Sequence, residues 1–134
     1  MTRRVIYNDD NQGITETNPG TAAQDLRAWV DKPLTQLTID TFAWCIALPD
    51  IVHHNSRVGE IYGKRFKEPP NQTALAIAEL IEQGTDVLHV VADQAHKHDV
   101  EFVAGIRMGD THFPHLADPL VPQFMLDHPE YVIR

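Results

Sequence analysis

The feature that most constrains this chain of 134 residues is a strand-like run followed by a helix-like run, which occurs three times. The strand-like runs, rich in β-branched and aromatic residues, are predicted at 5–7, 37–42 and 100–106. Such alternation favours parallel strands connected by helical crossovers. The sequence therefore predicts an α/β fold with about three parallel β-α units.

Helical periodicity follows these runs. The apolar residues of the first predicted helix share one face: Ala22, Leu26, Trp29 and Val30. Thr21 and Gln24, at its start, have the spacing of a capping box. Two further helices are predicted over 74–81 and 87–95, and Gly84 between them suits a helix C-cap.

A long polar stretch from about residue 49 to residue 70 interrupts this alternation, and it contains His53 and His54. Connections of this length are uncommon in compact domains unless they form a lid or part of a binding site. We therefore expect this stretch to have such a role.

Charge and cysteine content narrow the range of partners. With 11 basic and 19 acidic residues, the net charge is −8. The chain has no basic stripe for nucleic acid or for an anionic membrane. Cys45 is the only cysteine, so no disulfide can form within the chain, which fits a reducing compartment. The apolar run at 5–7 is too short for a signal peptide, and the chain is expected to be cytoplasmic.

Polar residues gather where the predicted strands end. The three clusters lie at residues 8–10, 40–44 and 107–112. Parallel α/β folds bind their ligands at the carboxyl ends of the strands. Turn chemistry explains one such cluster equally well, but three at the same end of a sheet favour a site. The candidate substrate-binding residues are Asn8, Asp9, Asp40, Trp44, Arg107, Asp110 and His112.

These candidates also have structural interpretations. Arg107, with Asp110 and His112, forms either a hydrogen-bonding set for a hydroxylated substrate or an Arg–Asp pair that holds the loop. For Asp9, an Asp-rich turn that bonds its own backbone is favoured over acid/base chemistry. Trp44 is a candidate for sugar stacking, although a single Trp at a strand end is more often part of the core.

The sequence gives little support for a metal site, a catalytic nucleophile or a phosphate-binding loop. The histidines do not form the Cys/His quartet of a zinc site, so no metal is predicted. The chain has neither a Gly-x-Ser-x-Gly elbow nor a glycine-rich phosphate loop. These absences disfavour protease, esterase, kinase and dinucleotide-dependent oxidoreductase activities, and no cofactor is predicted.

Three segments carry a family resemblance. They are 86–101, which includes Ala-His-Lys at 95–97, then Arg-Met-Gly-Asp-Thr-His at 107–112, and His-Pro-Glu-Tyr at 128–131. The chain resembles bacterial glycoside-hydrolase-like barrel proteins, which have a helix ending in Ala-His-Lys, a strand ending in Arg-Met-Asn-Asp-x-His, and a later His-Pro-Glu-aromatic segment. Gly109 replaces the family's Asn.

The resemblance implies a (β/α)8 barrel, with residues 1–134 as its incomplete N-terminal part and Asn8 and Asp9 facing the cleft. Glycoside hydrolysis needs two carboxylates at a fixed separation. The relatives carry theirs on later strands, so we assign no catalytic acid or nucleophile. The implied function is action on carbohydrate, with this chain as an N-terminal fragment that is inactive alone. The alternative is a non-enzymatic α/β interaction module that self-associates through its open sheet.

Overall fold

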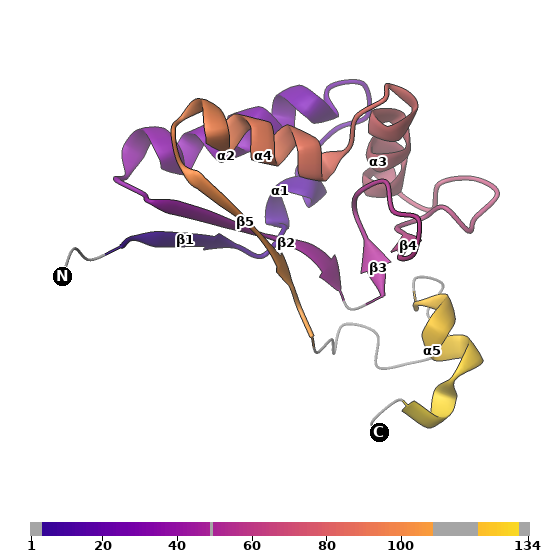
Figure 1. The fold of residues 1–134 in the computed structure, drawn as a ribbon. Coiled ribbons are helices and arrows are strands. Elements are labelled where there is room, and N and C mark those ends of the chain that lie inside the picture. Colours follow the sequence, from indigo (N-terminus) through magenta and orange to yellow (C-terminus); the bar gives the residue numbers. More distant parts are fainter. Residues whose placement is uncertain (1–3, 49, 109–120, 132–134) are drawn as a thin grey trace.

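The computed structural model describes residues 4–48, 50–108 and 121–131. Its centre is a parallel sheet made of β1 (Ile6–Asp9), β2 (Thr41–Leu48) and β5 (Glu101–Ile106), as Figure 1 shows. β2 lies in the middle and pairs in parallel with both neighbours. The predicted α/β class and the parallel pairing of these strands are confirmed.

Two short strands extend the sheet at the far end of β2. β3 (Ile51–Val52) pairs antiparallel with β2, and β4 (Glu60–Ile61) pairs in parallel with β3. The sheet of five strands is therefore mostly parallel and open. Both short strands come from the polar stretch at 49–70, which folds back against the end of β2.

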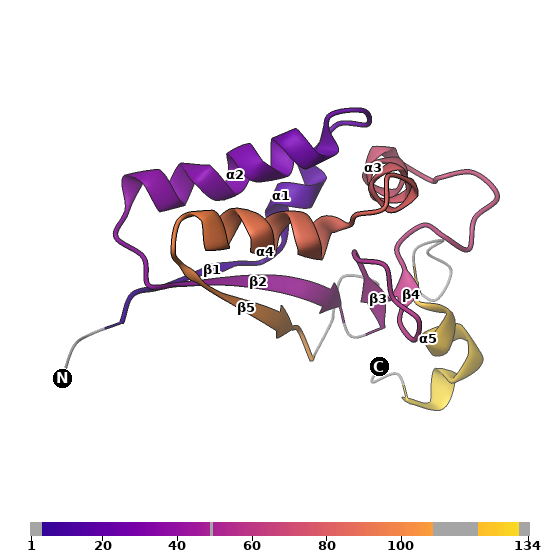
Figure 2. The ribbon, with the colours of Figure 1, turned by 45° about the horizontal axis from the view of Figure 1, so that its top comes forward.

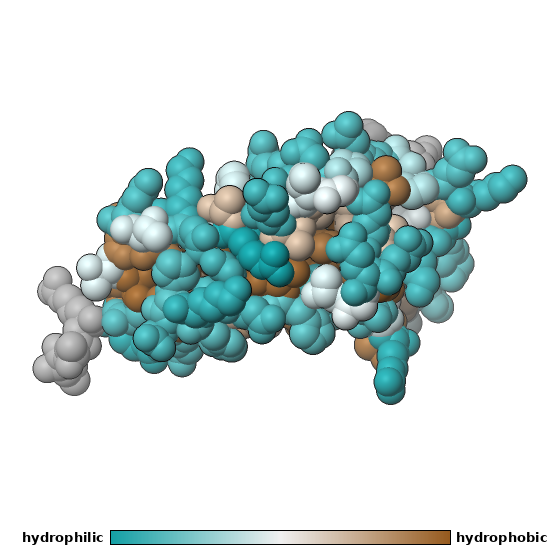
Figure 3. Space-filling model, turned by 90° about the horizontal axis from the view of Figure 1, so that it is seen from above, coloured by the Kyte–Doolittle hydropathy of each residue, from teal (hydrophilic) through white to brown (hydrophobic). Residues whose placement is uncertain are grey.

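Helices cover one face of this sheet. The helices of the described residues, in chain order, are α1 (Gln12–Thr15), α2 (Ala22–Gln36), α3 (Gln72–Glu82), α4 (Val87–Lys97) and α5 (Gln123–Asp127), and a 3-10 turn follows at Pro129–Tyr131. α2 and α4 lie side by side above β1, β2 and β5, whereas α5 lies beyond the end of the sheet (Figure 2). Seen from above, this helical layer presents mostly hydrophilic side chains, with apolar atoms visible between them (Figure 3).

The hydrophobic core lies between the helices and the sheet. Phe42 and Trp44 of β2 are almost completely buried there, and the Phe42 ring stacks on those of Tyr7 and Trp44 at centroid distances of 5.4 and 6.1 Å. Leu26 and Val30 of α2 are buried in the same core on its helical side. We call this side of the three parallel strands the covered face.

The opposite side, which we call the uncovered face, has no helix over it among the described residues (Figures 1 and 2). Side chains alternate between the two faces along a strand, so the neighbours of the residues that enter the core point to the uncovered face. One row runs from Asn8 through Ala43 to Val103. Ile6 and Val103 are 63% and 42% exposed. The uncovered face is therefore partly apolar and open to solvent.

Helix ends agree with the predicted boundaries in most places. The side chains of Asn71 and Asp86 accept hydrogen bonds from Ala74 N and His89 N, both at 2.9 Å, and so cap α3 and α4. Gly84 follows α3 with a φ of +80°, a left-handed conformation that glycine adopts without strain. The predicted end of the helix at Gly84 is confirmed, although the C-cap residue itself is Gln83 and Gly84 directly follows it.

The predicted capping box at the start of α2 is wrong. The Thr21 side chain makes no capping bond and instead donates from Oγ1 to Asp25 Oδ2 at 2.9 Å. The same carboxylate accepts from the backbone N–H and the side-chain amide of Asn18. A charged acceptor in the first helical turn thus attracts the hydroxyl that would otherwise cap the backbone.

The second strand lies further along the chain than predicted, at Thr41–Leu48 rather than 37–42. The helical turns of α2 continue to Gln36, and Leu37 ends the helix with its side chain half exposed. The strand forms over the segment that contains Phe42 and Trp44, because these two rings fill the space between the sheet and the helices.

Candidate binding site at the carboxyl ends of the parallel strands

An ion pair joins the two outer strands of the parallel sheet at their carboxyl ends. Arg107, which follows β5, pairs through its guanidinium with the carboxylate of Asp10, which follows β1. The Arg107 backbone N–H donates to Ala47 O of β2 at 3.1 Å, so the sheet fixes the base of this side chain. The pair therefore crosses above the end of β2 and brings three strand ends to one place.

Alternation places these two residues on the uncovered face. Asp10 follows Asn8 by two positions, and Arg107 follows Val103 and Gly105 at the same interval. Ala43 on the central strand β2 has a small side chain and Gly105 on β5 has none, so neither covers the polar groups. The Asp10 side chain is 54% exposed and that of Arg107 is 25% exposed. Asn8, Asp10 and Arg107 thus form a polar cluster on this face, which we call the strand-end cluster.

Asp9 does not belong to this cluster, because it points to the covered face. It is buried, and its Oδ2 accepts from Trp29 Nε1 at 2.7 Å. Its Oδ1 accepts from Gln12 N at 3.1 Å, at the start of α1. The bond from Gln12 N matches the favoured interpretation of Asp9 as a residue that bonds its own turn, whereas the bond from Trp29 ties it to α2.

The predicted position of Asp40 at a carboxyl end is wrong. β2 begins at Thr41, so Asp40 lies at the amino end of that strand, where its Oδ2 accepts from Val5 N at 2.7 Å. The structure also places Trp44 in the core, 1% exposed, rather than at a surface where a sugar could stack. Asp110 and His112 lie outside the described residues.

A buried polar pair lies next to these strand ends and was not singled out from the sequence. Asn11 Nδ2 donates to His53 Nδ1, and both residues are about 95% buried. Asn11 has a φ of 67°, a left-handed conformation that Asn tolerates better than most residues. Its side chain thereby turns back from α1 towards the segment that follows β3. Because His53 Nδ1 is an acceptor, the neutral ring carries its proton on Nε2.

Burial governs the charge of His53. It lowers the pKa of this imidazole to about 4, and the nearby His54 contributes in the same direction. Asn11 Oδ1, Trp44 Nε1 and His54 Nδ1 are buried and have no hydrogen-bonding partner among the described residues. A neutral imidazole thus lies next to the carboxyl ends of the strands, together with buried polar atoms that no other described residue contacts by a hydrogen bond.

The arrangement suits hydrogen bonding more than metal binding. A guanidinium, a carboxylate and an amide together provide both donors and acceptors for hydroxyl groups. Within the ranges 4–48, 50–108 and 121–131, no three His, Cys, Asp or Glu side chains gather as a metal site would require.

Comparison with family models and with curated proteins finds no match for this chain. Searching the described residues for a helix of sufficient length and hydrophobicity to cross a membrane finds none.

Proposed function

We propose that this chain contributes three strand–helix units to a (β/α)8 barrel of the glycoside-hydrolase-like kind, and that its strand-end cluster binds the hydroxyl groups of a carbohydrate. The observation that carries the proposal is the Arg107–Asp10 pair, which spans three parallel strands at their carboxyl edge. Barrel enzymes bind their substrates at this edge.

The order of the strands supports a barrel over a doubly wound sheet. β1, β2 and β5 follow one another across the sheet, and the helices between them lie on one face (Figure 1). In a doubly wound sheet the strand order reverses and helices cover both faces. In a barrel the helices form an outer ring, and the other face of each strand points inward. The uncovered face, with Asn8 and Val103, corresponds to such an interior.

The chemistry of the cluster supports a neutral, hydroxylated ligand. The Arg107 charge is already compensated by Asp10, so a second anion gains little from it. The planar guanidinium and the Asn8 amide remain suited to directional bonds with hydroxyl groups. The catalytic carboxylates of such a barrel are expected on strands beyond these three, and the chain alone is expected to bind without hydrolysing.

The test is titration of a panel of neutral oligosaccharides into the whole chain, followed by amide chemical shifts in NMR spectra. We expect shifts centred on residues 8–10 and 105–107, and about a tenfold loss of affinity in Arg107→Gln, as one lost charged hydrogen bond implies. Arg27→Gln, on the solvent side of α2, is the matched control and should bind like the parent. Equal affinity of the two variants would contradict the proposal.

A second candidate function is supported by the exposed apolar residues Ile6 and Val103 and by the outer edge of β5, with which no other strand of the described residues pairs. In this alternative the chain is an interaction module that self-associates through its open sheet. Light scattering at increasing concentration tests it, with Val103→Lys expected to reduce the average mass. A monomer that melts sharply at high concentration would contradict both this candidate and the barrel.

A further inference from the structure

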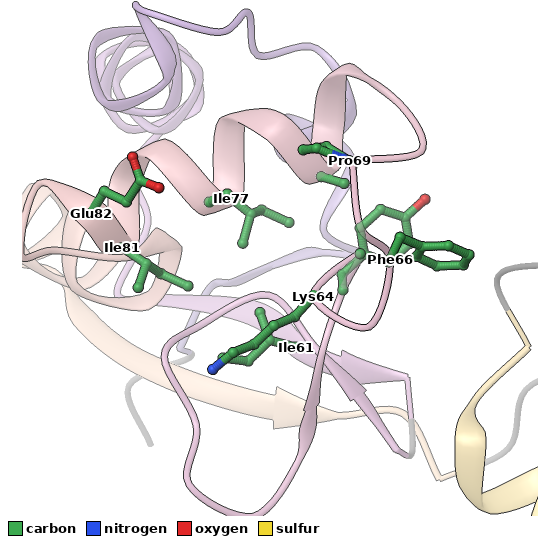
Figure 4. Close-up of a pocket in the computed structure, with 11 residues that line it drawn as sticks. Ile61, Lys64, Phe66, Pro69, Ile77, Ile81 and Glu82 are labelled. Atoms are coloured by element: carbon green, nitrogen blue, oxygen red, sulfur yellow. The ribbon is translucent and has the colours of Figure 1, made fainter.

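The polar stretch at 49–70 builds a cavity that lies outside the strand-end cluster. Residues 61–69 and α3 form the two walls of a space of about 270 Å³, shown in Figure 4. Its lining is mainly apolar and includes Ile61, Phe66, Pro69, Ile77 and Ile81. An apolar cavity of about 150 Å³ is large enough for benzene. This space therefore accommodates an aromatic or branched aliphatic group with atoms to spare.

Local contacts hold the wall in place. Gly63 has a φ of +79°, and a Cβ at this position would lie 2.4 Å from Ala74 Cβ, so the chain passes α3 at a distance that only glycine permits. Arg65 pairs with Glu60 at 3.1 Å, and its guanidinium lies 5.1 Å from the centre of the Phe66 ring. The walls are thus fixed at a spacing that leaves the cavity open.

Two side chains of opposite charge line the cavity. Lys64 and Glu82 both line it, and within the described residues neither side chain has a hydrogen bond or an ion pair. Figure 4 shows Lys64 running along the loop side towards the end of α3 that carries Ile81 and Glu82. Glu82 is the last residue of α3, where the helix dipole adds partial negative charge. The cavity therefore offers a cation on one side and a negative region on the other.

We infer that this cavity binds a small zwitterion with an apolar body, of which an apolar amino acid is the simplest class. The apolar body fills the space between Ile61 and Ile77, the ligand carboxylate faces Lys64, and the ligand ammonium faces Glu82 and the end of α3. A ligand with one charge would meet the opposing charge of the protein without compensation. This inference does not depend on the function of the strand-end cluster.

The experiment compares phenylalanine with phenethylamine, which lacks the carboxylate, and with 3-phenylpropanoate, which lacks the ammonium. Each is titrated into the whole chain and followed by calorimetry and by the amide shifts of residues 61–82. Phenylalanine should bind about 3- to 10-fold more tightly than either analogue, since solvent-exposed charge pairs contribute modestly. Absence of saturable binding, or equal binding of the three compounds, would overturn the inference.

Variants assign each charge to its partner. Lys64→Met should reduce phenylalanine binding to the level of phenethylamine, and Glu82→Gln should reduce it to the level of 3-phenylpropanoate. Lys67→Met removes an exposed lysine of the same loop and is the matched control, expected to bind as the parent does. If Lys64→Met and Lys67→Met behave alike, Lys64 does not hold the carboxylate and the inference fails.

Discussion

The two faces of the same three parallel strands differ in kind. The covered face presents large rings, with Tyr7, Phe42 and Trp44 packed under α2 and α4. The uncovered face presents small, polar or partly exposed aliphatic groups at the paired positions, such as Ala43, Asn8 and Val103, and ends in the Asp10–Arg107 pair. One face therefore forms the core, and the other has side chains that are open to solvent. Substitutions on the two faces should have very different energetic effects.

The largest expected difference comes from shortening one side chain on each face. Phe42→Ala removes a fully buried ring and should lower the free energy of unfolding by about 3–5 kcal/mol. Val103→Ala removes atoms that are already half in water and should cost less than about 1 kcal/mol. Urea denaturation monitored by circular dichroism measures both. Similar costs would mean that the uncovered face is buried against another surface in solution.

The next effect concerns pH and the buried pair behind the strand ends. Unfolded His53 takes up a proton near its usual pKa of 6.5, whereas folded His53 stays neutral until its pKa of about 4. Stability from this residue is therefore fully present above pH 6.5 and declines as the pH falls towards 4. A difference of this size corresponds to about 3 kcal/mol.

Substitution isolates this contribution from that of the carboxylates. His53→Gln keeps a polar side chain but cannot take up the proton, so the free energy of unfolding should depend less on pH between 6.5 and 4 than in the parent. His96→Gln, at an exposed position on α4, is the control and should keep the parental slope. An unchanged slope in His53→Gln would show that His53 is protonated in the folded protein.

The comparison of the faces also explains what the sequence could predict. Periodicity identified the covered face, because Leu26 and Val30 on a helix and the rings on β2 follow local repeats of 3.6 and 2. Strand boundaries depend on which segment best fills the core, and the shift of β2 moved Asp40 to the opposite end of the sheet. Local sequence patterns do not show which of two neighbouring segments fills the core better.

The polar side chains were harder to place for a different reason. Alternation alone separates Asp10 from Asp9, and that signal was available in the sequence once the end of β1 was known. The Asn11–His53 pair joins residues 42 positions apart, through a left-handed turn and a short strand that have no periodic signature. The cavity beside α3 likewise depends on how the 49–70 stretch folds back, which only the tertiary structure specifies.

The smallest expected effect comes from adding one methyl group to each face. At Gly13, on the covered side, a Cβ would lie 2.7 Å from Trp29 Cδ1 and 2.8 Å from Trp44 Cη2. Overpacking of this kind costs about 1–3 kcal/mol, and the better helix propensity of Ala offsets about 1 kcal/mol of it. We therefore expect Gly13→Ala to lose about 1 kcal/mol in urea denaturation.

Gly105, on the uncovered face, should tolerate the same change. Of the described residues, a Cβ there would meet the Trp44 backbone alone, with its nearest atom at an ordinary 3.5 Å. Ala also restricts the unfolded chain more than Gly does, which favours the folded state by about 0.4–1 kcal/mol where the backbone permits it. Gly105→Ala should therefore leave stability unchanged or slightly raised in the same measurement. A clear loss at Gly105 would mean that another surface packs against Gly105 closely enough to exclude a methyl group, and the contrast between the faces would then disappear.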